Sequence, residues 1–554
     1  MRLPFADRAT RATAGGAPAT PATATQPDAS AVTGVAPNRL SLLLLVFIGG
    51  VSSLALEMLG PRLMAPFFGT SLFIWANQIG FTLIYLSLGY YIGGRVADRH
   101  PSMRLLCALT AAAALFTGLI PFISGPVLNA AAIALNSEIP NVFVGSLFAV
   151  VLLFSVPTIL LGMVSPFAIR LTVSGVGSAG RIAGNLYALS TVGSIIGAFL
   201  PVLVLIPDLG VRRSFFLVSV TLLAVSLLGL RGATRIGVAI PGALLLLPLL
   251  LPQFVSLGPL KGVSGIGYGT VVNERESLYN FIQVVRGPDG SMNLLLNEGH
   301  AIHSMYLPGR VLNGQSWYTD YALAAPLFAA HGASDTRPRL AVVGLAAGTV
   351  AKQYTAVYGP TPIDGVEIDP EIVAVGRQYF AMNEPNLHVT IADGRTFMRF
   401  AHATYDVVMV DAYKPPYIPF QLTTTEFFQE SRAHMAPDGV IVLNTSHVGS
   451  DYRLVHAFVN TLSQVFPSVY TLDVPGALNT EIIATVTPTT LSQVQARLSA
   501  AAQTNGGSPL GIVANETEPL VQTAHAQRGG LVFTDDEAPV EQISDQLIID
   551  YIQH

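Results

Sequence analysis

Charge is scarce in this 554-residue sequence: only 11% of the residues are Asp, Glu, Lys or Arg, whereas 51% are hydrophobic. Soluble globular proteins usually have about a quarter of their residues charged. The shortage is local, because residues 41–260 contain only ten arginines and four acidic residues. We therefore do not expect a chain that is soluble throughout, and we expect residues 41–260 to lie largely in a lipid bilayer.

Cysteine is almost absent as well, since Cys107 is the only one in the chain. A single cysteine excludes an intramolecular disulfide and a metal centre built from cysteines alone. We expect no metal site, because no cysteine or further histidine near His300 and His303 completes a ligand set. The formal net charge of −5 lacks a basic excess, so we expect no nucleic-acid partner.

Residues 1–38 are rich in Ala, Thr, Pro and Gly and have no hydrophobic periodicity. Such a segment buries too little apolar surface to offset the entropy of ordering, so we predict a disordered tail. It contains no short apolar segment followed by a cleavage site, and the first long apolar run starts near Leu40. These features favour a retained membrane anchor over a cleaved signal peptide.

Residues 39–257 are predicted to form an α-helical, multi-span membrane domain of about seven helices. The apolar stretches of spanning length are 40–58, 72–94, 104–124, 141–164, 186–206, 214–230 and 236–255. The last stretch contains three prolines and is the weakest prediction. Two pairs of glycines have the four-residue spacing that lets helix backbones approach closely, although glycine is also common in membrane helices without that role: Gly89 with Gly93, and Gly193 with Gly197.

Glu57 follows the apolar part of the first span and precedes Arg62. A carboxylate near hydrocarbon is costly and is usually paired or functional. The alternative is an interfacial glutamate at the end of a helix.

Basic residues are unevenly distributed over the connecting segments. If the N-terminus is inside, the inner side holds eleven arginines, whereas the outer side holds only Arg62, Arg212, Arg213 and Lys261. The positive-inside rule therefore predicts a cytoplasmic N-terminus, in a bacterial inner or plasma membrane. Seven spans would place the C-terminal half outside. If that half uses a cytoplasmic metabolite, one span is miscounted, and the proline-rich 236–255 is the first candidate.

Beyond residue 261 the composition is that of an ordinary soluble protein. Residues 276–299 alternate around Gly287-Pro288-Asp289-Gly290, which predicts a small β-hairpin subdomain over residues 262–310. In residues 311–554, strands such as 340–343 alternate with helices. This alternation predicts an α/β, Rossmann-like domain of the class I methyltransferase type, with a doubly wound and mostly parallel sheet.

Ligands of such sheets bind at the carboxyl ends of the strands. These ends carry the small-residue turn 344–348, Glu367, Asp393 and Asp411. Glu367, about twenty residues after the turn, is well placed to accept hydrogen bonds from ribose hydroxyls, and Asp393 with Gly394 could meet an adenine amino group. The competing interpretations are a plain tight turn and helix caps, the latter also for Asp369 before Pro370. Three acids at successive strand ends favour a nucleoside site.

These residues resemble those of the spermidine synthase (polyamine aminopropyltransferase) family over roughly residues 265–470. The whole chain is similar to the membrane-fused branch of that family, on the stretch from Glu57 to Arg99 and the ending TDDEAPVE at 534–541. The resemblance implies a transferase of polyamine biosynthesis with no prosthetic group. Its co-substrate is decarboxylated S-adenosylmethionine, its second substrate is an amine, and one product is methylthioadenosine. The oligomeric state stays open, and a homo-oligomer is compatible with the resemblance.

The resemblance also implies residue roles. Asp411 corresponds to the catalytic carboxylate that deprotonates the attacking amine. Asn280 stands where the family usually has a glutamine near the nucleoside. The implied donor-binding residues are Asn280, Gly344, Gly348, Glu367, Asp393 and Gly394.

The sequence departs from the family at two positions. Ala347 replaces an aspartate of the glycine loop, and Lys414 replaces a second aspartate three residues after Asp411. Both changes remove negative charge where a diamine would bind. The candidate residues of an acceptor pocket are His303, Tyr318, Tyr413, Tyr417, Asp535 and Asp536. Each has an alternative: core packing for the aromatic residues, and a turn or helix cap for the two aspartates.

Two other functions compete with aminopropyl transfer. The lost acidic charge at Ala347 and Lys414 could make room for the methionine carboxylate of intact S-adenosylmethionine. Alternatively, the membrane half transports or senses polyamines, and the nucleotide fold is a nucleoside-binding regulatory module.

Overall fold

The computed structural model describes residues 39–68, 72–134, 142–173, 176–230, 232–250, 269–297, 301–330, 337–414 and 417–553. The predicted disordered tail and His300 lie outside these residues. Up to residue 250 the described chain is helical, and from residue 269 it combines strands with helices. This change follows the change in composition.

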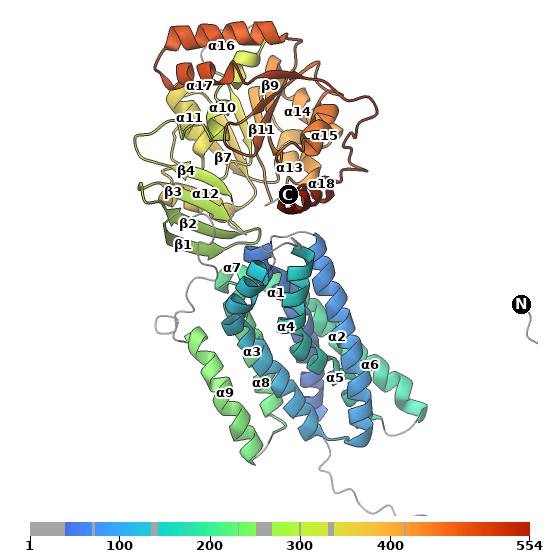
Figure 1. The fold of residues 1–554 in the computed structure, drawn as a ribbon. Helices are drawn as coiled ribbons and strands as arrows, with labels where there is room; N and C mark the ends of the chain where they lie inside the picture. The colour runs from blue at the N-terminus through green and yellow to red at the C-terminus, as the bar shows by residue number, and fades with distance from the viewer. Residues whose placement is uncertain are drawn as a thin grey trace, which may run out of the picture. The chain divides into compact units, whose positions relative to one another are not determined.

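The first half is a bundle of helices that run alongside one another (Figure 1). Its segments are α1 (Arg39–Phe68), α2 (Leu72–Arg99), α3 (Met103–Ala134), α4 (Val142–Gly162), α5 (Val164–Thr172), α6 (Val176–Leu200), the π-helix Pro201–Leu205, α7 (Ile206–Leu209), α8 (Val211–Leu227) and α9 (Gly232–Leu250). By length and composition, four segments are long and apolar enough to cross a membrane: Arg39–Phe68, Met103–Ala131, Val144–Thr172 and Ser178–Leu209. Helices α2, α8 and α9 coincide with predicted stretches but are not among these four. The helical half is thus compatible with a membrane protein.

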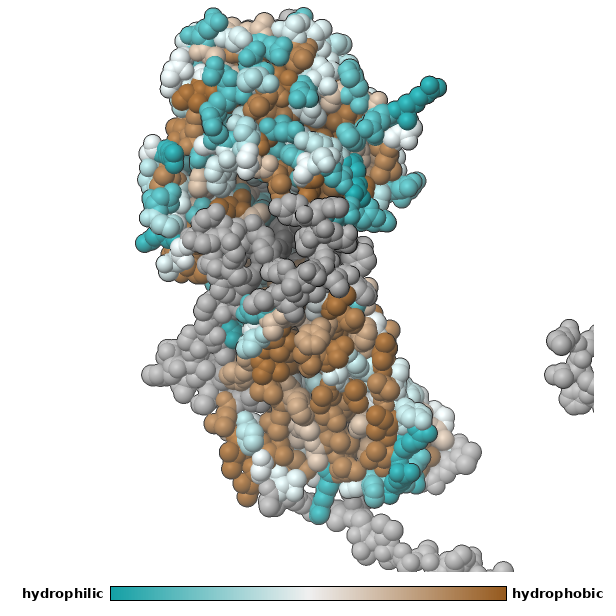
Figure 2. Space-filling view, in the orientation of Figure 1, coloured by the Kyte–Doolittle hydropathy of each residue, from teal (hydrophilic) through white to brown (hydrophobic). Residues whose placement is uncertain are grey.

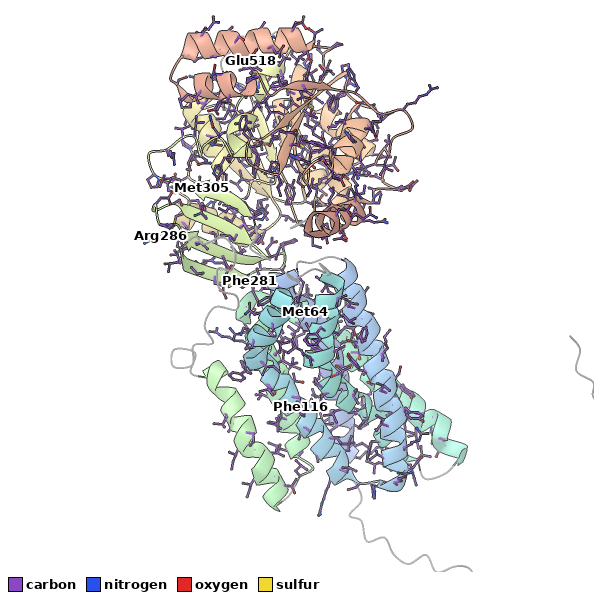
Figure 3. All side chains as sticks on the ribbon, in the orientation of Figure 1. Met64, Phe116, Phe281, Arg286, Met305 and Glu518 are labelled. Carbon is purple, nitrogen blue, oxygen red and sulfur yellow. The ribbon has the colours of Figure 1, made fainter. Side chains whose placement is uncertain are left out.

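Apolar side chains cover much of the face of this bundle that Figure 2 shows. Figure 3 labels one buried and one exposed apolar residue of the bundle: Met64 on α1 is fully buried, whereas Phe116 on α3 is 44% exposed. Tyr91 on α2 and Ile240 on α9 are more than half exposed. A surface of this kind suits contact with hydrocarbon better than contact with water.

Helices α1 and α6 approach each other at one of the two predicted glycine pairs. A Cβ atom on Gly193 would lie 2.2 Å from the carbonyl oxygen of Phe47, and one on Gly197 would lie 2.1 Å from that of Val51. Only glycine permits backbones to come this close. The predicted close packing is therefore confirmed here.

The second pair packs in the same way. A Cβ atom on Gly89 of α2 would lie 2.3 Å from the carbonyl oxygen of Ile159 on α4, and one on Gly93 would lie 2.7 Å from the Cα atom of Met163. The prediction is confirmed at this pair as well.

Helix α1 is longer than the predicted first span. It continues through Pro61 and Pro66 to Phe68, because neighbouring helices in a bundle tolerate prolines that would break an isolated helix. Glu57 consequently lies inside α1 and is half-buried, so its interpretation as a helix-end residue is wrong.

A four-stranded antiparallel sheet opens the second half. Its strands are β1 (Thr270–Glu276), β2 (Phe281–Arg286), β3 (Met292–Leu296) and β4 (Ile302–Tyr306), in that order. Figure 3 labels both ends of β2, Phe281 and Arg286, and Met305 on β4. The turn between β2 and β3 is closed by the Gly290 N–H, which donates to the Gly287 carbonyl at 3.0 Å. One face of this sheet packs on α12 (Pro370–Tyr379).

The larger sheet has eight strands in the order β12-β10-β11-β9-β8-β5-β6-β7. They are β5 (Leu340–Val343), β6 (Ile363–Glu367), β7 (Leu387–Ile391), β8 (Tyr405–Val410), β9 (Met435–Ser446), β10 (Ser468–Asp473), β11 (Asn479–Thr485) and β12 (Gln522–Ala524). Strands β5 to β9 pair in parallel, and β10 to β12 are antiparallel additions at one edge. The predicted Rossmann-like, mostly parallel sheet is confirmed.

Side chains alternate between the two faces of this sheet and bury a core on each. Val342 and Met409 belong to one core, which is covered by α10 (Tyr318–Ala322), α11 (Thr349–Tyr358), α16 (Leu491–Asn505) and α17 (Pro509–Thr517). Val343 and Val410 belong to the other, which is covered by α13 (Gly394–Arg399), α14 (Thr425–Ala433), α15 (Arg453–Leu462) and α18 (Val540–Gln553). Helices on both faces leave the carboxyl ends of the strands as the natural place for a site.

Candidate active site

The parallel strands reverse their order between β5 and β8. From β5 the chain adds β6 and then β7 on one side, and it then adds β8 and β9 on the other. A crevice at the carboxyl end of such a switch point is where doubly wound sheets bind ligands. Glu367 is the last residue of β6, and Asp411 directly follows β8. The sheet therefore brings these two predicted site residues to the same edge.

The turn after β5 is built for close approach. Gly344 has φ +94°, and a Cβ atom there would lie 2.4 Å from the carbonyl oxygen of Asp411. Gly348, with φ +86°, precedes α11 and is crowded by Met382. Both positions require glycine because other residues rarely adopt this conformation. Ala346 also has a positive φ, +49°, and marks a strained turn.

Glu367 holds this turn in place. Its Oε2 accepts a hydrogen bond from the Ala346 N–H at 2.9 Å, and its Oε1 accepts one from the Asp369 N–H at 3.1 Å. The side chain is only 7% exposed, and burial raises the pKa of Glu367 to about 7. Each carboxylate oxygen has a further lone pair, so Glu367 can still accept a hydroxyl hydrogen.

Asp393 caps the helix that follows it. Its Oδ1 accepts a hydrogen bond from the Thr396 N–H at 2.9 Å, as expected for the N-cap of α13. Gly394 begins that helix, and a Cβ atom there would collide with Val343 at 2.4 Å. The capping interpretation therefore holds for Asp393. Its second oxygen, Oδ2, has only a long contact with Gln421 among the described residues and can accept a hydrogen bond from another donor.

Asn280 joins the small sheet to the large one. Its Nδ2 donates to Asp369 at 3.0 Å, and its Oδ1 accepts a hydrogen bond from Asn297 at 2.9 Å. Asp369 in turn caps α12 through the Glu371 N–H, as its position before Pro370 predicts. The Asn280 amide is thus engaged in a structural link.

Asp411 receives two side-chain hydrogen bonds. Tyr318 Oη donates to its Oδ2 at 2.8 Å, and Asn444 Nδ2 donates to its Oδ1 at 2.8 Å. Burial raises the pKa of Asp411 to about 7, although both hydrogen bonds favour the ionised form. Asp411 thus combines a fixed orientation with a proton affinity suited to a general base at neutral pH.

Sequence reasoning missed two residues beside Asp411. Asn444 lies on β9 and Glu481 pairs with it on β11. Asn479 Nδ2 donates to the Asn444 Oδ1 at 2.9 Å and fixes the amide orientation. The available signal was a polar residue inside an apolar strand, IVLNTS in β9 and TEIIAT in β11. Burying a polar side chain costs free energy unless the side chain is hydrogen-bonded or paired with a charge, so its presence in an apolar strand indicates a specific partner.

Of the other candidates for the acceptor pocket, some lie beside Asp411 and Asn444 and others lie elsewhere. Tyr318 contacts Asp411 directly, and Tyr413 donates to the Asn444 carbonyl at 3.1 Å. Tyr417 is instead buried, and its hydroxyl donates to Asp545 on α18. His303 lies on β4, where burial lowers its pKa to about 4 and keeps the ring neutral.

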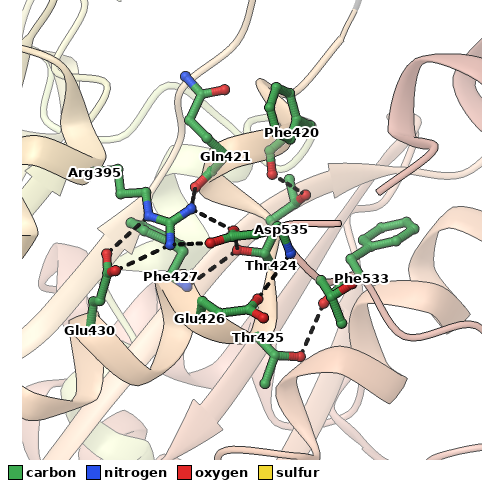
Figure 4. Close-up of polar contacts among 12 residues, drawn as sticks. Arg395, Phe420, Gln421, Thr424, Thr425, Glu426, Phe427, Glu430, Phe533 and Asp535 are labelled. Atoms are coloured by element: carbon green, nitrogen blue, oxygen red, sulfur yellow. Dashed lines mark hydrogen bonds and ion pairs between the residues drawn. The ribbon is translucent and has the colours of Figure 1, made fainter. Parts of the chain in front are cut away.

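Asp535 belongs to an ion-pair cluster (Figure 4). Arg395 donates to both of its carboxylate oxygens, at 2.6 and 2.8 Å, and also binds Glu430. Thr424 adds a hydrogen bond at 2.8 Å. The charge of Asp535 is therefore neutralised by Arg395, and these contacts do not bring it to Asp411. Asp536 is exposed.

The two departures from the family pattern also have clear positions. Ala347 is 1% exposed and its N–H donates to Ser304 on β4 at 3.0 Å. Lys414 is exposed, and its backbone pairs with that of Tyr417. Neither position brings a carboxylate to the site.

Comparison with known proteins finds relatives among the polyamine aminopropyltransferases. A family model described as the spermine/spermidine synthase domain matches residues 332–496. The chain is 32% identical over 317 residues to a probable polyamine aminopropyl transferase of Bifidobacterium longum, which covers 54% of this chain and 69% of that protein. It is 26% identical over 289 residues to the polyamine aminopropyltransferase of Vibrio vulnificus, which covers 49% of this chain and 90% of that protein.

Among solved structures, a probable spermidine synthase from Corynebacterium glutamicum matches with a TM-score of 0.36 and 22% identity, over 47% of this chain and 98% of that one. The family assignment rests on the sequence relatives, because the match to the Bifidobacterium longum protein covers more than two thirds of that protein. The chain belongs to the polyamine aminopropyltransferase family, the transferases of polyamine biosynthesis that use decarboxylated S-adenosylmethionine as co-substrate and an amine as acceptor.

Proposed function

We propose that this chain is a membrane-attached aminopropyltransferase in which Asp411 is the general base. The observation that carries the proposal is the environment of Asp411: it follows β8 at the switch point, and Tyr318 and Asn444 each donate a hydrogen bond to its carboxylate. A carboxylate held in this way can take a proton from an ammonium group and orient the resulting amine.

The proposed reaction is a single nucleophilic displacement at carbon. Asp411 accepts one N–H proton of the acceptor, and the nitrogen lone pair attacks the aminopropyl carbon bonded to the sulfonium sulfur. The carbon–sulfur bond breaks, and its electron pair returns to sulfur, which neutralises the sulfonium. The products are the lengthened amine and methylthioadenosine. The carboxylate also stabilises the cationic reactants while they approach.

For the donor we assign the edge formed by β5, β6 and β7. In this assignment Glu367 accepts hydrogen bonds from the ribose hydroxyls through its remaining lone pairs, and the second oxygen of Asp393 accepts one from the adenine amino group. The glycines at 344 and 348 allow the backbone to approach the nucleoside closely. Asn280 acts in this scheme by holding Asp369 and the small sheet in place.

The test uses the purified full chain in detergent, with decarboxylated S-adenosylmethionine and a panel of amines. Release of methylthioadenosine is expected, and Asp411→Asn is expected to lower the rate at least about a hundredfold, because a positioned base contributes about that much. Asp406→Asn is the matched control, since Asp406 is an exposed residue at the other end of β8. No release with any amine would overturn the proposal.

A second candidate, transfer from intact S-adenosylmethionine, is favoured by one observation. The buried Ala347 leaves the glycine turn without a carboxylate that would repel the methionine carboxylate of that donor. Calorimetric titration with both donors separates the two functions. Tighter binding of the decarboxylated donor supports aminopropyl transfer, and tighter binding of the intact donor supports the second candidate.

We further propose that the N-terminus and the catalytic half both face the cytoplasm of a bacterial inner membrane. The excess of arginine over one set of connecting segments supports this orientation of the N-terminus. A nucleoside donor made inside the cell requires the same side for the catalytic half.

A polyamine transporter or sensor would instead retain its biological activity in Asp411→Asn and lose it in Glu57→Gln.

A further inference from the structure

Three polar residues form a row across neighbouring strands at the edge that holds the site. Val410 of β8 pairs with Leu443 of β9, so the next residues, Asp411 and Asn444, are also neighbours. Asn444 in turn pairs with Glu481 of β11. Side chains in such a row point to the same face of the sheet. Asp411, Asn444 and Glu481 therefore share one face.

Glu481 has an unusual environment within this row. Its side chain is 0% exposed, and neither carboxylate oxygen receives a hydrogen bond from any described residue. Burial and the nearby Asp411 raise the pKa of Glu481 well above its usual value. The neighbouring Asn444 does not donate to it either: its Nδ2 donates to Asp411, and its Oδ1 accepts from Asn479.

A buried carboxylate without donors needs either a proton or a cation. Within the described residues, no group of three or more His, Cys, Asp or Glu side chains is arranged to hold a metal ion. An ammonium group, in contrast, brings three hydrogen-bond donors and one positive charge. Ala347 and Lys414 supply no carboxylate to the site, whereas Glu481 does and lies close enough to Asp411 for their charges to interact.

We propose that Glu481 binds the second, non-reacting ammonium group of an aliphatic diamine or polyamine acceptor while Asp411 deprotonates the first. This assignment rests on the proposed aminopropyl transfer and names the residue of this chain that holds the far end of the acceptor. Strands in a sheet are about 4.8 Å apart, so the Cα atoms of Asp411 and Glu481, two strands apart, are separated by about 10 Å. Two carboxylates on one face at that separation suit two nitrogens joined by a short aliphatic chain.

Tyr318 and Tyr413 complete this subsite. Burial and the negative charges of Asp411 and Glu481 raise the pKa of both hydroxyls well above its usual value, so both stay protonated. Neutral phenol rings can line the methylene chain of the acceptor and their faces can attract its ammonium groups. The aromatic walls therefore match the same ligand class as the two carboxylates.

The experiment compares 1,4-diaminobutane with n-butylamine, which has the same carbon chain but lacks the second nitrogen. Glu481→Gln is expected to lower kcat/KM for the diamine about 10- to 100-fold, mainly through KM, because one hydrogen-bonded charge pair is lost. The rate with n-butylamine is expected to stay the same. Glu481→Asp keeps the charge and is expected to restore part of the loss.

Glu518→Gln is the matched control, because Glu518 lies at the end of α17 and is remote from the row in sequence and element (Figure 3). Thermal unfolding checks the fold of each variant. An equal loss for both amines, or no loss for either, would overturn the assignment of Glu481 while leaving the proposed transfer intact.

Binding provides a readout that does not depend on turnover. Calorimetric titration of 1,4-diaminobutane into the full chain, saturated with methylthioadenosine, is expected to give a Kd about 10- to 100-fold weaker for Glu481→Gln than for the unmodified chain. Equal affinities would contradict the assignment. Diamine binding without any methylthioadenosine release would instead retain the Glu481 subsite and reject the proposed transfer.

Discussion

The carboxylate of Asp411 experiences opposing influences. Burial raises its pKa to about 7, whereas hydrogen bonds from Asn444 and Tyr318 stabilise its charge. Only the ionised carboxylate can accept a proton, so kcat/KM is expected to rise with pH along a limb centred near 7. An ordinary aspartate would place that limb about three units lower. The deprotonation step is therefore most sensitive to pH in the physiological range.

Tyr318 is one of the two residues whose hydrogen bonds lower the pKa of Asp411. Tyr318→Phe removes a hydrogen bond to the ionised form, so the pKa of Asp411 is expected to rise and the midpoint of the limb to move up by about one pH unit. Tyr321→Phe is the control, because Tyr321 lies on the same helix as Tyr318 but donates to the Gln315 carbonyl and not to Asp411. The measurement is kcat/KM against pH for all three proteins. A midpoint unchanged in Tyr318→Phe would show that the hydrogen bond does not tune the base.

Single residues could be predicted from the sequence only where their position next to an apolar strand indicated a role. Glu367 and Asp411 stand at the ends of apolar strands and could be identified as candidate site residues. Asn444 and Glu481 could not, since their importance comes from pairing between β9 and β11, which are separated by a helix and a strand. The position of Asp535 beside Arg395 was equally hidden, because that ion pair joins residues 140 positions apart.

At the scale of elements, the packing of α1 against α6 depends on glycine. Gly197→Ala is expected to destabilise the helical half by about 1–3 kcal/mol, because the added Cβ atom meets the Val51 carbonyl oxygen. Gly184→Ala on the same helix is the matched control, since no atom lies within 4 Å of an added Cβ there. Thermal unfolding in detergent measures both variants. Equal stability of the two would contradict the close packing.

Elements were predicted with uneven success for physical reasons. Strand β5 coincides with the predicted 340–343, because short apolar segments between turns have few alternatives in an α/β domain. The antiparallel strands β10 to β12 carry no periodic signal that distinguishes them from parallel ones. Helix α1 extended beyond its predicted end because tertiary packing tolerated two prolines.

At the scale of the whole molecule, the orientation in the membrane can be tested with the near absence of cysteine. In a Cys107→Ala background, a cysteine at the exposed Gln503 is expected to resist a membrane-impermeant maleimide in intact cells and to react after permeabilisation. Cys107 itself is fully buried, so its replacement leaves no exposed group changed. Labelling of Gln503→Cys in intact cells would place the catalytic half outside and contradict the proposed orientation.

Hydropathy and periodicity are local properties of the chain, so the division into an apolar helical half and a less apolar α/β half could be predicted from the sequence. The same holds for the acids at the ends of the parallel strands. The surroundings of the acidic residues became visible only in the folded chain: Tyr318 and Asn444 beside Asp411, Arg395 beside Asp535, and Glu481 buried without a donor. Burial and pairing between distant strands set the charge state of each carboxylate, and neither can be read from neighbours along the chain.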